Sequence, residues 1–158
     1  MRRFILVVVV GAVASLMALG SASAGTVGVS GLQTPTATSN VYVMTGSLIG
    51  IWTQTSFELG VFTPSGVVTG TGTEQFDGCF DADASGGCGQ GDPEGTLFFS
   101  FTFSAKYDTL TFAELHGRCH HPITGGTDGF AGASGVLDFK DDPVTGCASY
   151  KGHISIAD

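Results

Sequence analysis

The chain has 158 residues, a length that fits a single domain, and its formal net charge is −8 at pH 7. So acidic a chain is expected to repel nucleic acid and anionic membrane surfaces, and neither is predicted as a partner. It contains 25 glycines and no long stretch with a 3.6-residue apolar period, which argues against a helical fold.

The N-terminus has the three parts of a secretory signal peptide. Arg2 and Arg3 precede an apolar run, and Ala22-Ser23-Ala24 follows it as a small-x-small cleavage site. The alternative is a transmembrane anchor, but the apolar run is barely long enough to span a bilayer. We therefore predict a signal peptide over residues 1–24, secretion after cleavage, and no membrane anchor in the mature chain.

The rest of the chain has the pattern of a β-protein. The Thr/Ser-rich stretch GLQTPTATSN predicts a flexible N-terminal arm over residues 25–40, followed by one β-domain over 41–158. In TLFFSFTFSA, the residues of one face are Leu97, Phe99, Phe101, Phe103 and Ala105, which is the period-two pattern of a strand. Candidate strands separated by Gly, Pro, Asp or Ser predict a sandwich or a barrel: 41–46, 47–55, 57–63, 66–76, 95–105, 107–117, 134–140 and 149–156.

All four cysteines lie after the predicted cleavage site, and an even number in an exported chain predicts disulfides. Of the three possible pairings we predict Cys79–Cys88, which closes a short acidic turn, and Cys119–Cys147, which ties two later segments together. The spacings of 9, 31 and 28 residues fit none of the usual zinc patterns.

The segment Gly125–Phe139 reads GGTDGFAGASGVLDF. It resembles the G-G-T-G-x-F-x-G-A-x-G pattern of allene oxide cyclase-like and dirigent-like proteins, with Asp128-Gly129 as the departure. The matching positions are Gly125, Gly126, Thr127, Phe130, Gly132, Ala133 and Gly135. The resemblance implies a single antiparallel eight-stranded barrel with a cavity, in which Phe130 closes one end. It carries no catalytic residue of those families onto this chain.

The acidic stretch DADASGGCGQGD has the spacing of a calcium loop. Oxygen ligands are expected at positions 1, 3, 5, 7 and 12, with glycine at position 6. The ligand positions hold Asp81, Asp83, Ser85, the Gly87 carbonyl and Asp92, and Gly86 stands at the turn. Position 12 is Asp instead of the usual Glu, and no flanking helices are predicted. The alternative is a solvated turn closed by Cys79–Cys88 without a cation.

The segment YDTLTFAELHGRCHHP suggests polar groups in the lumen. If Leu110 and Phe112 point inward, strand alternation also turns Glu114, His116 and Arg118 inward, where they could bind a ligand or act in acid–base chemistry. A bulge in this strand would instead turn these charges out to water.

These observations favour a non-enzymatic barrel that binds a small apolar ligand or serves a structural role. One alternative is a cavity isomerase or cyclase of the allene oxide cyclase-like type, with Glu114, His116 or Arg118 as catalytic candidates. Another is a calcium-stabilised extracellular interaction protein. An enzyme needs polar groups that converge in the lumen, whereas a binding protein can be lined by aromatic side chains alone.

Overall fold

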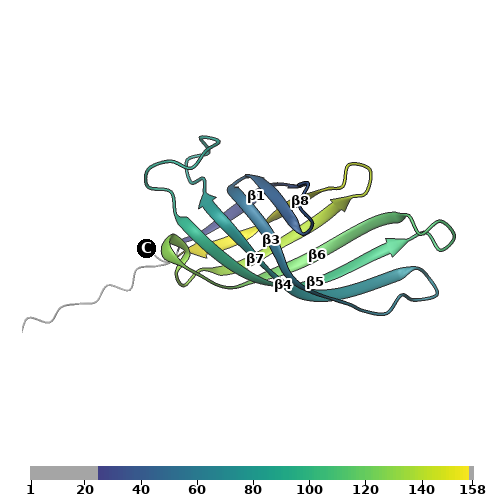
Figure 1. The fold of residues 1–158 in the computed structure, drawn as a ribbon. Coiled ribbons are helices and arrows are strands. Elements are labelled where there is room, and N and C mark those ends of the chain that lie inside the picture. The colour runs from purple at the N-terminus through teal and green to yellow at the C-terminus, as the bar shows by residue number, and fades with distance from the viewer. Residues whose placement is uncertain (1–24, 157–158) are drawn as a thin grey trace, which may run out of the picture.

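A computed structural model describes residues 25–156, and the predicted signal peptide lies outside the described residues. The described chain forms a closed barrel of antiparallel strands, in which each strand pairs with the next and the last pairs with the first (Figure 1). The elements are β1 (Gly25–Pro35), β2 (Val41–Gly46), β3 (Leu48–Leu59), β4 (Val67–Phe80), β5 (Glu94–Tyr107), β6 (Glu114–Gly126), the short 3₁₀ turn η1 (Asp128–Phe130), β7 (Ser134–Asp142) and β8 (Cys147–Ile156). The prediction of an all-β, single, eight-stranded antiparallel barrel is therefore confirmed.

The first strand corrects the prediction of a flexible arm over residues 25–40. Residues Gly25–Pro35 form β1, which pairs with β8 along one edge and with β2 along the other, and so closes the barrel. The physical reason is that a barrel without this strand would leave the edges of β2 and β8 unpaired. No helix within residues 25–156 is long and apolar enough to cross a membrane.

One half of the barrel interior is a packed apolar core. Its fully buried side chains come from alternate positions of most strands: Met44, Leu48, Trp52, Phe76, Leu97, Phe99, Leu137 and Ile154. Phe130 of η1 is also completely buried and packs against Phe76 with a ring-centroid distance of 6.3 Å. Phe130 lies after the end of β6, so it closes this end of the barrel, as the sequence pattern predicts.

The other half of the interior opens at the end that holds the loops 36–40, 60–66, 108–113 and 143–146. We call this end the mouth. Two irregularities in the strand pairing decide which side chains point inward near it. The register shifts between Gln54 and Ser56 in the β3–β4 pair, and between Lys106 and Tyr107 in the β5–β6 pair. Each extra residue exchanges the inward and outward positions of the strand that carries it.

Candidate functional site in the barrel lumen

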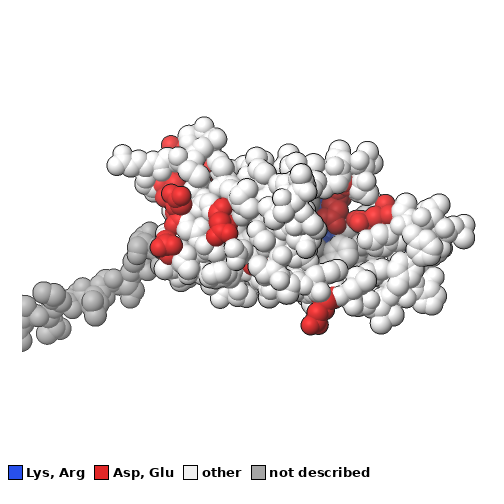
Figure 2. All heavy atoms as spheres, viewed as in Figure 1, with Lys and Arg blue, Asp and Glu red and all other residues white. Residues whose placement is uncertain are grey.

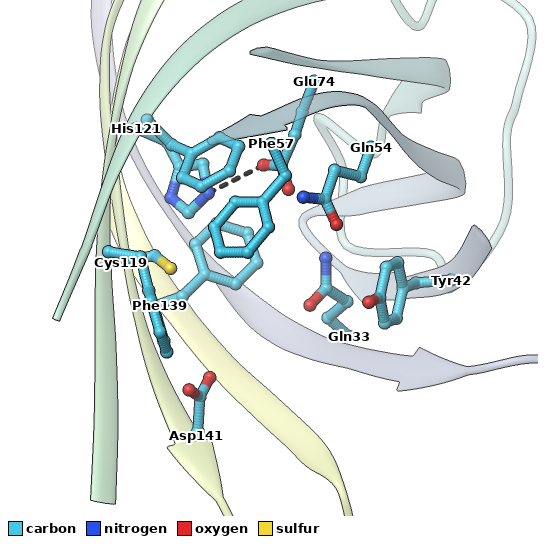
Figure 3. Close-up of a pocket in the computed structure, with 11 residues that line it drawn as sticks. Gln33, Tyr42, Gln54, Phe57, Glu74, Cys119, His121, Phe139 and Asp141 are labelled. Carbon is cyan, nitrogen blue, oxygen red and sulfur yellow. Dashed lines mark ion pairs between the residues drawn. The ribbon is translucent and has the colours of Figure 1, made fainter. Parts of the chain in front are cut away.

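A cavity of about 240 Å³ lies in the lumen on the side of the mouth (Figure 3). Its lining combines aromatic rings with polar groups: Gln33, Tyr42, Gln54, Phe57, Glu74, Phe101, Phe103, Cys119, His121, Phe139 and Asp141. The residues come from seven different strands, β1 to β7, so only the closed barrel brings them together. An eight-stranded barrel is wide enough to hold one small ligand when its interior is not completely filled by side chains.

Glycines on the inner face of β4 make room for the aromatic lining. Phe57 and Phe101 stack with ring centroids 5.9 Å apart and an interplanar angle of 14°. A Cβ atom at Gly70 would meet the Phe57 ring, and one at Gly72 would meet the Phe101 ring. The repeated glycines of the TGTGT stretch thus let two rings lie flat against the barrel wall.

The polar centre of the cavity is a pair of enclosed side chains, Glu74 of β4 and His121 of β6. His121 Nε2 lies 2.8 Å from Glu74 Oε2, and their side chains are only 4% and 10% exposed. The contact is an ion pair by distance, but Glu74 Oε2 has no partner in hydrogen-bonding geometry, and neither has His121 Nδ1. The imidazole is thus the only partner of Glu74 Oε2, and His121 Nδ1 keeps unused hydrogen-bonding capacity, which is costly in a protein interior.

The histidine is held in place by aromatic packing. Its ring centroid lies 4.5 Å from that of Phe139, 5.5 Å from that of Phe101 and 5.5 Å from that of Trp52. Figure 3 shows Gln33, Gln54 and Tyr42 turned toward the same space from the opposite side of the cavity. A bound molecule would thus meet apolar faces around it and several hydrogen-bonding groups at fixed positions.

A second polar group, closer to the mouth, is the carboxyl pair Asp141 and Glu114. Burial, and then the neighbouring Glu114 carboxyl, raise the pKa of Asp141 to about 6. Gly117 allows this approach, because a Cβ atom there would collide with both carboxyls. The Tyr107 hydroxyl donates to Glu114 Oε2 at 3.3 Å, while Glu114 Oε1 is buried without a partner. Near pH 6 the pair can hold or release a proton.

Two further groups of the lining stay neutral at physiological pH. Burial, followed by the Asp141 and Glu74 carboxylates, raises the pKa of the Cys119 thiol well above its usual range. Burial and the Glu74 carboxylate likewise raise the pKa of Tyr42. The thiol is therefore not an activated nucleophile, since reactive cysteines have depressed pKa values. The Tyr42 phenol keeps its proton and can donate a hydrogen bond.

The mouth of the barrel carries a cluster of exposed apolar side chains, which we call the apolar rim. It consists of Leu59, Val61, Phe62, Leu110, Phe112 and Leu115 from the β3–β4 and β5–β6 hairpins. Phe62 joins the two hairpins by packing on Phe112 and Tyr107, with ring centroids 5.9 and 6.2 Å apart. The outermost part of this end, at the right of Figure 2, shows no charged side chain. Exposed apolar patches of this kind mark sites of interaction with apolar molecules or surfaces.

Of the three catalytic candidates from the sequence, only Glu114 points into the barrel. His116 and Arg118 are exposed on the outer wall, so the inward orientation is wrong for both, and the alternative of a bulge that turns them to water is the one found. The reason is the bulge in β6: Lys106 pairs with His116 but Tyr107 pairs with Glu114, which leaves Leu115 as the extra residue. Beyond it the inward positions are occupied by Gly117, Cys119 and His121 instead.

Several lining residues were not predicted as site residues, although alternation from buried aromatic positions points to them. Glu74 lies two positions before Phe76, Asp141 two after Phe139, and Tyr42 two before Met44. His121 has no such signal, because His120-His121-Pro122 has the composition of a turn. The structure places all three residues inside β6, where His121 is 3% exposed.

One of the two predicted disulfides is present. Cys79 and Cys88 are bonded, whereas Cys119 and Cys147 are free thiols, so the Cys119–Cys147 prediction is wrong. Cys119 lines the lumen, while Cys147 precedes the inward-facing Ala148 and therefore faces the other side of the wall. Strand β7 also lies between the strands that carry the two cysteines.

The acidic loop between β4 and β5 lies at the end of the barrel opposite the mouth (Figure 1). Carboxylate oxygens of Asp81, Asp83 and Asp92 lie within 4.8 Å of one another. Asp81 accepts the Ser85 and Gly86 amides at 2.9 and 2.8 Å. Asp92 accepts the Ala82 and Gly89 amides at 3.2 and 2.7 Å, and the Ser85 hydroxyl donates to the Gly87 carbonyl at 3.1 Å. These hydrogen bonds hold the loop together, and calcium binding remains a prediction.

The fold and the site together define a closed antiparallel β-barrel with a partly polar lumen. No family model, no curated protein and no solved structure matches the chain. The functional argument therefore depends on the geometry of the lumen and of the outer surface.

Proposed function

We propose that the lumen binds a small neutral molecule that is mostly apolar and carries one hydroxyl or carbonyl group. The observation that carries this proposal is the enclosed pair of Glu74 and His121 in the lining of a cavity of about 240 Å³ whose other walls are largely aromatic. A ligand hydroxyl can donate to the Glu74 carboxylate, and a hydroxyl or carbonyl oxygen can accept from the Tyr42 phenol or from the Gln33 and Gln54 amides. The rings of Phe57, Phe101 and Phe139 supply the apolar contact for the rest of the molecule.

The charges of the lumen favour a neutral ligand. Glu74, Asp141 and Glu114 place three carboxyl groups in or beside the cavity, against the single imidazole of His121. A ligand carboxylate would be repelled by these groups in a site of low dielectric constant. A neutral alcohol or ketone avoids this repulsion and can still form the hydrogen bonds that the lining offers.

The apolar rim supports the same class of ligand. Its exposed side chains lie on one side of the open end, on the β3–β4 and β5–β6 hairpins, so an apolar molecule can approach the cavity along an apolar surface. The cavity and its polar lining support the apolar ligand expected from the sequence, and we propose that these polar groups select within that class.

Trp52 is the single tryptophan of the chain and can serve as a fluorescent probe of ligand binding in the lumen. The indole centroid lies 5.1 Å from that of Phe139 and 5.5 Å from that of His121, and both of these residues line the cavity. The test is titration with 1-octanol, n-octane and sodium octanoate, followed by tryptophan fluorescence and calorimetry. We expect octanol to bind most tightly and octanoate most weakly.

Cavity variants make this test specific. Cys119→Phe fills the lumen and should abolish octanol binding, while Cys119→Ala is the matched control that leaves the space open. Glu74→Gln should weaken octanol but leave octane unchanged. Failure of all three probes to bind, or equal binding by Cys119→Phe and Cys119→Ala, would disprove a lumen ligand site.

A second candidate function is acid–base catalysis in the same cavity, as in a cavity isomerase or cyclase. This candidate is favoured by two carboxyl groups of the lining that have different surroundings. Glu74 is paired with His121, and burial raises the pKa of Asp141 to about 6. Carboxyl and imidazole groups that line one cavity are the residue types that serve as base and acid in an isomerisation or ring closure. The sequence resemblance to allene oxide cyclase-like proteins supports the same candidate, with Glu74, His121 and Asp141 replacing His116 and Arg118 as residues to test.

One pair of variants distinguishes a binding function from a catalytic function. Neutral unsaturated epoxides and ketones are incubated with the protein, and mass-neutral rearrangement is followed by NMR. An isomerase would lose turnover at least about a hundredfold in Glu74→Gln, the size typical of a general base, while Cys119→Ala would keep it. Binding without any rearrangement of these substrates contradicts the catalytic candidate and leaves the binding function in place.

A further inference from the structure

Basic side chains gather on one part of the outer surface of the barrel. Arg118 of β6, Lys140 of β7 and Lys151 of β8 are exposed, and they are three of the four Lys and Arg residues within 25–156. The face of the molecule in Figure 2 carries several groups of acidic side chains and almost no basic surface. In a chain with 14 acidic and six basic residues, the positive charge is therefore concentrated instead of mixed with the negative charge.

The strand register sets these groups in two neighbouring rows. In the first row Ser104 lies opposite Arg118, Arg118 opposite Lys140, and Lys140 opposite Ser149. In the second row the order is Thr71, Thr102, His120, Asp138 and Lys151. Neighbouring strands lie about 4.8 Å apart, so each row spans four strand spacings or fewer, under about 20 Å. We call these two rows the basic wall.

The positive charges of the basic wall have no intramolecular partners. Neither Arg118, Lys140 nor Lys151 forms an ion pair with any of the described residues. The one carboxylate in the rows, Asp138, lies 2.7 Å from His120 Nδ1. Like charges directly opposite each other, such as Arg118 and Lys140, destabilise an antiparallel pair. An acidic protein that keeps such a pair, with Asp138 as the one carboxylate in the two rows, has a surface suited to an external anion.

The basic wall is hollowed. A depression of about 740 Å³ crosses the strands and is lined by Thr71, Thr102, Arg118, His120 and Lys151 among others. An adjoining depression of about 340 Å³ shares Arg118 and Lys151 and adds Lys140 and Ser149. Together they form a shallow groove lined by cationic side chains, hydroxyl side chains and one carboxylate, Asp138.

We propose that the basic wall binds an acidic polysaccharide, a sugar chain that carries carboxylate or sulfate groups. The guanidinium of Arg118 can hold such a group by two parallel hydrogen bonds, and the lysines add positive charge beside it. The Ser and Thr hydroxyls match the hydroxyls of the sugar rings. The two rows carry no Phe, Tyr or Trp on which nucleic acid bases could stack, which favours a sugar chain over single-stranded nucleic acid. This site lies outside the lumen and is independent of the function proposed for it.

The experiment measures retention of the protein on immobilised heparin and immobilised polygalacturonate, with neutral dextran and single-stranded DNA as comparison matrices. Arg118→Ser with Lys140→Ser is the test variant. Val43→Asp with Thr55→Asp is the matched control, since both residues are exposed on β2 and β3, on the side of the barrel opposite β6 and β7, and the net charge changes by the same amount. Thermal unfolding of each variant, with octanol binding as a second readout, shows that the barrel is intact.

We expect retention on at least one acidic polysaccharide that declines with added NaCl, and no retention on dextran. Affinity should fall about tenfold or more in the test variant and less than about twofold in the control. Three results would overturn the proposal: no retention of the parent at low salt, equal losses in the test and control variants, or binding to single-stranded DNA as tight as to the polysaccharides. Retention on heparin alone would narrow the ligand to sulfated chains.

Discussion

His121 Nε2 lies 2.8 Å from Glu74 Oε2, with both side chains enclosed by the barrel. The two residues are 47 positions apart in the sequence and lie on β6 and β4, which are separated in the barrel by β5. An enclosed pair of this kind is costly to break, because removal of one partner leaves the other buried without compensation. The pair is the polar centre of the proposed binding site and can be tested through stability alone.

Glu74→Leu and His121→Leu should each reduce the free energy of unfolding by about 3 kcal/mol, since each leaves one buried polar partner behind. The double variant should lose less than the sum of the two, by at least about 1 kcal/mol, because the residues are coupled. Urea denaturation of the four proteins of this double-mutant cycle measures the coupling. Additive losses would mean that the two side chains do not stabilise each other.

Asp141→Asn should stabilise the protein at pH 7 and have no such effect near pH 3.5. Burial and the Glu114 carboxyl raise the pKa of Asp141 from 3.8 to about 6, so folding favours the protonated form. The stability from this group is fully present below the unfolded pKa and is lost as the pH rises through about 6. The shift corresponds to about 3 kcal/mol, and solvent screening of a half-buried group reduces the expected gain to about 1 kcal/mol.

The matched control for Asp141 is its neighbour Asp142. Hydrogen bonds from Thr145 and Val144 lower the pKa of this exposed carboxyl, which is the opposite direction. Asp142→Asn should therefore leave stability at pH 7 unchanged or slightly lower. Thermal melting of both variants between pH 3.5 and 8 makes the comparison. If the two variants change the melting temperature equally at every pH, the fold does not favour the protonated form of Asp141.

The cysteines should react unequally. The oxidised protein is expected to contain one disulfide, Cys79–Cys88, and two free thiols. Under native conditions an alkylating reagent should label Cys147 before Cys119, because Cys119 faces the lumen and burial raises the pKa of its thiol. In urea both should react at similar rates. Peptide mapping that finds a Cys119–Cys147 bond would contradict the structure.

Cys79→Ser with Cys88→Ser should reduce the free energy of unfolding by about 2–3 kcal/mol, as expected for a short closed loop.

The acidic loop is expected to bind calcium weakly. Asp81 Oδ2 accepts one backbone amide and retains a further lone pair, and the Asp83 carboxylate is exposed. Extracellular calcium sites have dissociation constants of about 10⁻⁴–10⁻³ M. Calcium at about ten times that value would add about 1.4 kcal/mol, a rise in melting temperature of about 5 °C.

Asp83→Asn is the informative change in this loop, because it removes one charge and keeps a side-chain oxygen for the Ser85 amide. It should reduce the calcium-dependent rise in melting temperature, while Asp77→Asn, on β4 outside the loop, should not. Melting curves with a chelator and with millimolar calcium provide the measurement. Identical curves under the two conditions would mean that hydrogen bonds and the disulfide hold this loop without a cation.

Some features of this protein follow from local patterns in the sequence. The alternation in TLFFSFTFSA predicts the inward face of β5, where Leu97, Phe99, Phe101 and Ala105 are buried. The short spacing of Cys79 and Cys88 predicts their disulfide, which closes a loop without requiring any long-range contact. Such features are predictable because period-two alternation and short loop closure depend on neighbours in the chain.

Only the tertiary structure determines which side chains line the lumen. The bulge at Leu115 exchanges the inward and outward positions of β6, so that His116 and Arg118 face solvent while Cys119 and His121 face the cavity. No local pattern marks this extra residue, because a bulge depends on how two strands pair.

The closure of the barrel also depends on how strands pair. Residues Gly25–Pro35 have the composition of a loose arm, yet they form a strand because β2 and β8 both offer unpaired edges to it. The sequence by itself determined the fold class, the buried face of β5 and the disulfide Cys79–Cys88. Only the closed barrel decided which polar groups converge on the cavity and which basic groups share the outer wall, because both sets are assembled by register between strands that are distant in the chain.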